Sequence, residues 1–216
     1  MHRVLILLAL HSLLGLNAFA DDDLFDGDVF VGYSLFRVNS AQQQIPSFFA
    51  NGGIGTIAWN INNHLGIEAE FAGHHHGSTF DTTTFSYLFG PRVSYGRTKR
   101  FDPYMHVLLG GMHVTTSIDA SSALIPTPHP VPLPSSGRYK ASQDNFAFAA
   151  GGGIEIKVNH YILFRPIQID YVHTQFQTPT FLVTAQSLGP STNKNQNNVR
   201  YAVGFVFNWN DESVHQ

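Results

Sequence analysis

The sequence predicts an all-β protein, an eight-stranded antiparallel barrel in which each strand runs up or down beside the one before it. Segments of about ten residues with alternating apolar and polar side chains recur along the chain, and helical periodicity is almost absent. These segments number eight, an even number, and the connections between them alternate strictly between short and long. Together these observations indicate hairpins joined in series into a closed sheet.

The first twenty residues have the character of a signal peptide. A basic residue, Arg3, precedes an apolar run at 4–16, and a small-x-small sequence follows at 18–20. The apolar run is shorter than the roughly twenty residues of a membrane-spanning helix, and three aspartates come directly after the segment. We therefore expect residues 1–20 to be removed on export and residues 21–216 to form one barrel domain.

The expected strands are recognised by bulky apolar residues at every second position, because successive side chains of a strand point to opposite faces. The hairpin at 53–73 shows this in both arms, with Ile57 and Trp59 on one face of the first arm and Ile67 on one face of the second. Asn62 lies where the alternation breaks and suits a tight turn. Three other strands carry the sets Val29, Val31, Tyr33 and Leu35; Tyr87, Phe89, Val93 and Tyr95; and Phe146, Phe148, Ile154 and Ile156. The eight expected strands are residues 28–38, the two arms of 53–73, and residues 84–96, 102–115, 145–158, 161–174 and 198–209.

The connections separate into two kinds that would lie at opposite ends of the barrel. Five prolines at alternate positions from Pro126 to Pro134 remove amide donors from the longest connection, which favours a surface loop. Short turns at one end and long loops at the other are typical of transmembrane barrels of the bacterial outer membrane. The long connections are residues 39–49, 74–83, 116–144 and 175–197, and the short ones lie near Asn62, at 97–101 and at 159–160.

Composition indicates which face of the sheet points outward. Charged residues make up 12% of the chain, about half the roughly 25% of an average soluble domain, so few charges are available to cover a water-facing surface. The apolar set is bulky throughout, whereas the interior of an eight-stranded barrel has room only for side chains that fill it or for one small ligand. We therefore expect the apolar face to contact lipid. A soluble barrel of lipocalin type would place the same residues inside. The net charge of −3 gives no reason to expect nucleic acid as a partner.

Five stretches carry a family resemblance: VFVGYSLFR, NGGIGTIAWNINNHLGIEAEFAG, FGPRVSYGRTKRFDPYMHVLLGG, GGGIEIKVNHYILFRPIQIDY and NNVRYAVGFVFNW. In this order and spacing, the chain resembles small bacterial outer-membrane β-barrel proteins of the OmpA and OmpX type, often called the porin family. The resemblance implies an eight-stranded barrel in the cell outer membrane and a closing strand that ends on an aromatic residue, here Trp209. Seven residues follow Trp209, so we expect no appended peptidoglycan-binding domain.

Charged residues collect on the face expected to line the lumen. Arg165 has the wrong parity relative to Asp170 unless Pro166, which cannot donate to a ladder, marks a β-bulge. Paired carboxylates beside a histidine are compatible with general acid-base catalysis, but mixed charges also fill the lumen of OmpA-like barrels as ion pairs, and we expect this structural role. The expected lumen charge cluster is Glu68, Glu70, Arg92, His106, Glu155, Lys157, Arg165, Asp170 and Arg200. The expected aromatic girdle at the membrane boundaries is Trp59, Tyr95, Tyr171, Tyr201 and Trp209.

The histidine run at 74–76 is the strongest candidate for a metal site, because His74 and His76 would share one face of a strand. No third ligand of suitable spacing is evident, so we expect no metal site. His76 and Ser78 have the His-x-Ser spacing of outer-membrane lipid A deacylases, but the neighbouring residues of that motif are absent, and we expect no catalytic residues.

The expected function is therefore a structural or surface-interaction role in the outer membrane, without catalysis and without a cofactor. The expected partners are outer-membrane lipid, lipopolysaccharide and an extracellular ligand bound through the long loops, and the expected state is a monomer. A small-solute pore is the alternative function, and a soluble lipocalin-type carrier is a third interpretation.

Overall fold

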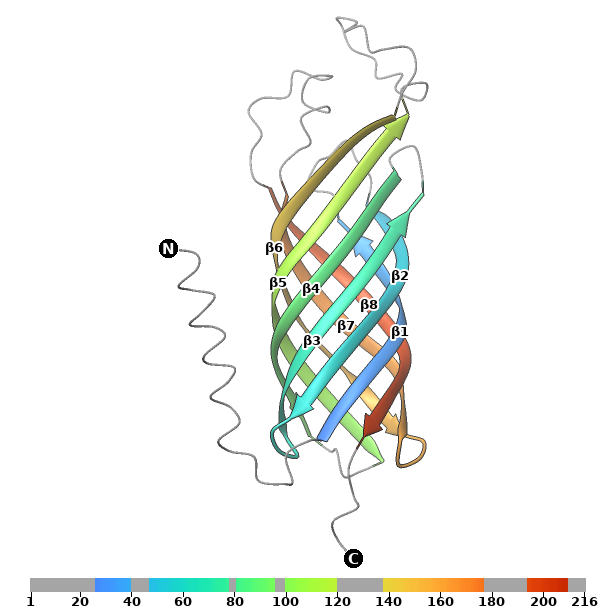
Figure 1. The fold of residues 1–216 in the computed structure, drawn as a ribbon, viewed down its shortest axis with the longest axis vertical. Helices are drawn as coiled ribbons and strands as arrows, with labels where there is room; N and C mark the ends of the chain where they lie inside the picture. The colour runs from blue at the N-terminus through green and yellow to red at the C-terminus, as the bar shows by residue number, and fades with distance from the viewer. Residues whose placement is uncertain are drawn as a thin grey trace, which may run out of the picture.

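A computed structural model of the chain describes residues 26–39, 47–77, 81–95, 100–119, 138–176 and 194–209. In these ranges eight strands form one closed barrel, in which each strand pairs antiparallel with the next and the first pairs with the last (Figure 1). The predicted fold class is thus confirmed. The expected signal peptide lies outside the described residues. The strands are β1 (Asp26–Val38), β2 (Phe48–Asn60), β3 (Leu65–His76), β4 (Asp81–Ser94), β5 (Phe101–Asp119), β6 (Arg138–Lys157), β7 (Ile162–Phe176) and β8 (Lys194–Trp209).

Two of the short connections are tight turns built on asparagine. The side-chain oxygen of Asn62 accepts hydrogen bonds from the backbone N–H groups of His64 and Leu65, at 2.8 and 2.9 Å. Asn159 does the same between β6 and β7, where it accepts from Tyr161 and Ile162. An asparagine oxygen replaces a backbone acceptor in such turns, which explains why the chain reverses here within a few residues.

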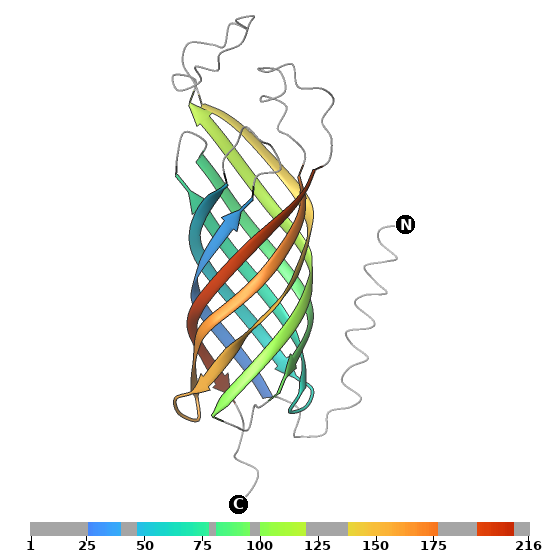
Figure 2. The ribbon, with the colours of Figure 1, turned by 180° about the vertical axis from the view of Figure 1, so that it is seen from behind.

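The strands at the opposite end extend further than the apolar alternation predicts. β5 continues to Asp119 and β6 begins at Arg138, so the longest connection is shorter than expected. Both views show β5 and β6 rising above the other strands (Figures 1 and 2). The ladder between them continues on polar residues, with the hydroxyls of Thr115 and Ser142 2.9 Å apart. Backbone pairing does not need apolar side chains, and the apolar pattern therefore ends before the strands do.

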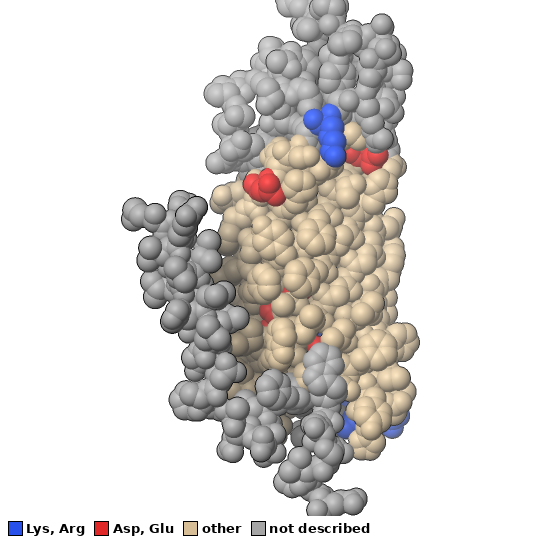
Figure 3. Space-filling view, in the orientation of Figure 1, with Lys and Arg blue, Asp and Glu red and all other residues tan. Residues whose placement is uncertain are grey.

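The outward face of the barrel is apolar, as predicted. Phe89 on β4 and Val107 on β5 are 49% and 45% exposed. Charged side chains are sparse between the two ends of the surface seen in Figure 3. Among the described residues, no helix is long and apolar enough to cross a membrane. An outward apolar belt contradicts the soluble-carrier interpretation, in which these side chains would lie inside. It is the arrangement of a barrel that crosses a membrane with its strands.

The lumen is filled by side chains of two kinds. Around its middle lies a polar network on β1 and on β3 to β8, described below. Nearer the long connections lies an apolar cluster, since Leu108 and Met112 follow His106 along β5 and Val172 follows Asp170 along β7. We call this cluster the apolar layer. Its buried members are Phe36, Ala50, Leu88, Leu108, Met112, Ala147, Ala149 and Val172.

Candidate functional site: the charge network of the lumen

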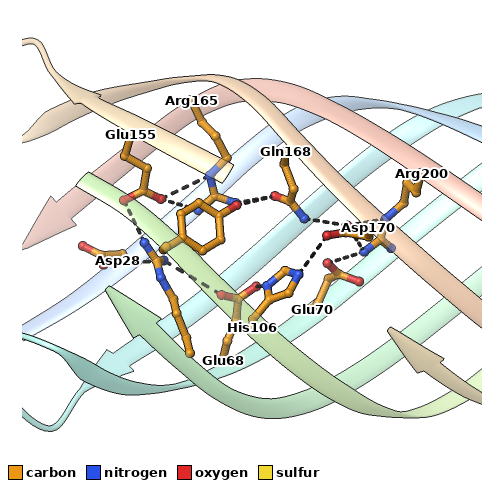
Figure 4. Close-up of polar contacts among 11 residues, drawn as sticks. Asp28, Glu68, Glu70, His106, Glu155, Arg165, Gln168, Asp170 and Arg200 are labelled. Atoms are coloured by element: carbon orange, nitrogen blue, oxygen red, sulfur yellow. Dashed lines mark hydrogen bonds and ion pairs between the residues drawn. The ribbon is translucent and has the colours of Figure 1, made fainter. Parts of the chain in front are cut away.

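Glu155 on β6 forms the centre of the half of the network nearer the short turns. Its carboxylate accepts hydrogen bonds from two guanidinium groups, Arg92 on β4 at 2.8 Å and Arg165 on β7 at 2.5 and 3.1 Å (Figure 4). Arg92 also lies 3.9 Å from Glu68 and 4.0 Å from Asp28. All five side chains are 4% exposed or less. Each buried charge in this half thus faces an opposite charge, as burial requires.

Arg200 on β8 forms the centre of the other half. Its terminal nitrogen Nη2 lies 2.6 Å from Glu70 on β3 and 2.6 Å from Asp170 on β7, and its Nε donates to Asp170 at 3.0 Å. Asp170 is the direct cross-strand neighbour of Arg200, whereas the contacts of Arg200 with Glu70 join β8 to a strand on the other side of the β8–β1 seam. The contact between Arg200 and Glu70 therefore depends on closure of the barrel.

Two further side chains join the halves. His106 on β5 places Nδ1 3.2 Å from Glu68 and Nε2 2.9 Å from Asp170. Gln168 accepts hydrogen bonds from Arg165 and from the hydroxyl of Tyr104, and it donates to Asp170 at 2.8 Å. All these side chains thus belong to one continuous set of contacts, which we call the lumen network (Figure 4). Its members are Asp28, Glu68, Glu70, Arg92, Tyr104, His106, Glu155, Arg165, Gln168, Asp170 and Arg200.

Aromatic faces and small residues complete the packing of the lumen network. The guanidinium carbons of Arg92 and Arg165 lie 4.2 and 4.6 Å from the ring centroid of Tyr104, and Arg165 lies 3.8 Å from that of Phe30. Cation–π contacts of this kind are strongest where water is excluded. Gly151 faces the lumen beside Asp170, where a methyl group would collide with the carboxylate. Gly151 therefore makes room for the carboxylate of Asp170.

The structure brings together eight of the nine residues expected in the lumen charge cluster. Arg165 reaches the lumen because the register of β7 against β8 shifts between Arg165 and Gln168, which is the bulge expected at Pro166. The ninth residue, Lys157, is half-buried at the end of β6 and takes no part in the contacts of the lumen network. The eight that meet are Glu68, Glu70, Arg92, His106, Glu155, Arg165, Asp170 and Arg200.

Three members of the lumen network are absent from the expected cluster. Tyr104 and Gln168 carry no charge, so selection by charge could not find them, although each shares the parity of an expected member two residues away. Asp28 is the first residue of the first expected strand and shares the parity of buried Phe30. Parity, applied to every polar residue and not only to the charged ones, is the signal that would have found all three.

Four of the five expected girdle residues have described side chains, and all four are exposed on the outside. Trp59, Tyr171 and Tyr201 are 41% to 48% exposed and Tyr95 is 73% exposed. The hydroxyl of Tyr171 donates to Asn197 at 2.7 Å, which is the contact expected of an aromatic residue between lipid and water. The backbone of Trp209 pairs with Gly27, and its side chain lies outside the described part.

The histidine run at 74–76 is divided between the two faces of β3. His74 is buried against Ser34 at 2.8 Å, whereas His75 is exposed and lies 3.4 Å from Asp81. In the described ranges no group of three potential ligands includes this run; Ser78 lies outside those ranges. One trio, Glu70, His106 and Asp170, has ligand atoms within 4.8 Å of one another. Arg200 already donates hydrogen bonds to Glu70 and Asp170, the two carboxylates of this trio. Its guanidinium group therefore supplies the positive charge there, and we assign no metal site.

Comparison with solved structures shows the fold. The attachment invasion locus protein Ail of Yersinia pestis is similar at 15% identity and a TM-score of 0.55, covering 86% of this chain and 99% of Ail. Neisserial surface protein A is similar at 10% identity and a TM-score of 0.57, covering 85% and 97%. A second structure of Ail, in complex with the heparin analogue sucrose octasulfate, is similar at 14% identity and a TM-score of 0.53, covering 86% and 99%.

Comparison by sequence adds the family. No curated protein matches the chain by sequence. The family model of the outer membrane protein beta-barrel domain matches residues 6–207, which is nearly the whole chain. The apolar outward face and the closed eight-stranded barrel agree with the outer-membrane location that this family's name gives. The chain therefore belongs to the outer membrane protein beta-barrel domain family and is a protein of the bacterial outer membrane.

Proposed function

We propose that this protein is a closed barrel with a structural and surface-interaction role in the outer membrane, and that it neither conducts solutes nor catalyses a reaction. The observation that carries the proposal is the lumen network itself. It connects side chains from β3 to β8 across the bore, and Arg92, Arg165 and Arg200 are each 1% exposed or less. A solute that crossed the barrel would have to break these buried ion pairs, which is costly.

The apolar layer supports the same conclusion. Leu88, Leu108 and Val172 are fully buried between the lumen network and the long connections. An ion that entered from that end would have to give up part of its hydration against these apolar side chains. The lumen therefore has two successive barriers of different chemistry.

The same burial argues against catalysis. His106 beside two carboxylates has the composition of an acid-base site, but both ring nitrogens face carboxylates and the residue is 2% exposed. A general base has to reach the proton it removes, directly or through one water. His106 has no such access to a substrate, and its hydrogen bonds hold the side chains of the lumen together.

The surface role rests on the end of the barrel that carries the long connections, which faces outward from the cell in barrels of this kind. β5 and β6 extend there beyond the other strands (Figure 2). Ser142 and Asp144 on β6 are exposed. The described charges at this end are of both signs: Arg37 and Lys140 are positive, and Asp81 and Asp144 are negative. This mixture gives no reason to transfer binding of a sulfated sugar from Ail. We propose that a monomer contacts lipopolysaccharide around its rim and an extracellular partner through this end.

A deletion strain separates the structural role from the pore. Loss of a pore lowers the rate at which a small hydrophilic β-lactam enters intact cells, whereas loss of a closed structural barrel leaves that rate equal or higher. We expect influx to be unchanged or raised and sensitivity to detergent to increase, with both restored by the wild-type chain. A fall in influx of twofold or more, reversed by the wild-type chain, would overturn the proposal.

A further inference from the structure

His106 stands in an arrangement that a neutral imidazole cannot satisfy. Nδ1 lies 3.2 Å from Glu68 and Nε2 lies 2.9 Å from Asp170, and both oxygens belong to carboxylates (Figure 4). An ionised carboxylate accepts hydrogen bonds and donates none, and a neutral imidazole carries only one N–H. One of the two contacts would then place two acceptors against each other. Only an imidazolium donates at both positions.

The neighbouring hydrogen bonds offer no other donor for this purpose. The second oxygen of Glu68 has no hydrogen-bond partner among the described residues, and the nearest nitrogen of Arg92 lies 3.9 Å from it. On Asp170, Arg200 and Gln168 both donate to Oδ2, which leaves Oδ1 to His106. His106 is therefore the donor on which one oxygen of each carboxylate relies.

The balance of charge points the same way. Five carboxylates take part in the lumen network and only three guanidinium groups face them. A positive imidazolium at the junction would supply a fourth cation between the two halves. The other titratable and charged groups of the lumen network are Asp28 on β1, Glu68 and Glu70 on β3, Arg92 on β4, Tyr104 on β5, Glu155 on β6, Arg165 and Asp170 on β7, and Arg200 on β8.

We propose that His106 is the fourth cation of the lumen, a doubly protonated imidazolium that joins the arginine-centred halves of the network, and that loss of its proton at alkaline pH releases the junction. The neutral ring has one N–H, so it keeps a hydrogen bond to one carboxylate and loses the hydrogen bond to the other. The two halves are then connected only through Gln168. The junction that His106 makes between the two halves is therefore sensitive to pH. The charge state of His106 does not depend on the proposed function.

Nitrogen NMR of histidine-labelled protein in lipid nanodiscs tests the charge directly. His74 is a matched control, because it is also buried in the lumen but faces a serine hydroxyl with one nitrogen, while its Nδ1 has no hydrogen-bond partner among the described residues. At pH 7.5 we expect both ring nitrogens of His106 to resonate as protonated nitrogens, and His74 to show one protonated and one bare nitrogen. The His106→Gln and His74→Gln variants assign the signals. A bare nitrogen on His106 at pH 7.5 would overturn the proposal.

The pH dependence of thermal stability tests the junction at His106 independently of the NMR spectrum. The temperature at which the folded gel mobility is lost is measured for the wild type, His106→Gln and His74→Gln from pH 6 upward. We expect His106→Gln to be less stable than the wild type at low pH, and this difference to shrink as the wild type loses the imidazolium. The difference between wild type and His74→Gln should stay constant. If the difference in stability between wild type and His106→Gln also stayed constant from pH 6 upward, a pH-sensitive junction at His106 would be ruled out.

Discussion

Reversing the charge of Arg92 is expected to destabilise the barrel more than placing a charge on its outward face. The Arg92→Glu variant places a new carboxylate against Glu155, Glu68 and Asp28, which lie 2.8 to 4.0 Å from the present guanidinium. Removing one partner of a buried ion pair costs about 3–5 kcal/mol, because the other partner is left buried and unpaired. Reversal adds repulsion, so we expect a loss of at least about 3 kcal/mol in the free energy of unfolding.

The measurement is urea-induced unfolding of the purified barrel in lipid vesicles. Arg37→Glu is the matched control, since Arg37 is an exposed arginine on the outward face of β1, 5.8 Å from the ring of Phe49. Exposed charges contribute on the order of 0–1 kcal/mol, so this reversal should change stability little. Equal effects of the two variants would show that Arg92 is not held in a dry lumen.

A charge on the outward face should have the second largest effect. Val107 lies midway along the apolar outward positions of β5, between Phe101 near the short turn and His113 near the long connection. An arginine at the midplane of the bilayer costs about 2–4 kcal/mol and near the boundary about 0–1 kcal/mol. We therefore expect Val107→Arg to lower the free energy of unfolding by about 2–4 kcal/mol. Phe101→Arg, on the same strand, should lower it by about 0–1 kcal/mol.

Unfolding in vesicles checks this pair as well. Both residues are exposed, at 45% and 57%, so differences in packing are small and depth in the membrane is the main variable. If Val107→Arg were as stable as Phe101→Arg, the outward face of β5 would not lie across lipid. The result is independent of the lumen network, because both side chains point away from it.

Which side chains share a face of the barrel could be predicted from the sequence, because the period of a strand is two and depends on nothing outside it. Alternation predicts the outward position of Val31, Tyr87 and Phe89, and all three are exposed. Even Arg165, which breaks the alternation, is expected inside if Pro166 marks a bulge, and the register of β7 shifts there. This local rule accounts for most of the fold.

The partners of each charge could not be predicted in the same way. Parity places Glu70 and Arg200 inside, but their contact depends on the relative height of β3 and β8 in a closed and tilted cylinder. Lys157 has the correct parity and still stays out of the lumen network, since it lies at the end of β6. Distance along the barrel axis, which alternation does not contain, decides between these outcomes.

Conductance of the purified wild-type protein in a planar bilayer tests the central claim, that the lumen network and the apolar layer close the bore. With Glu155 and Arg92 in contact at 2.8 Å and Leu108 buried above them, we predict at most rare and small current steps at neutral pH. Arg92→Glu, reconstituted at the same density, should show more frequent steps because the network is broken. Steady, large conductance of the wild type would contradict the closed barrel and establish a pore in its place.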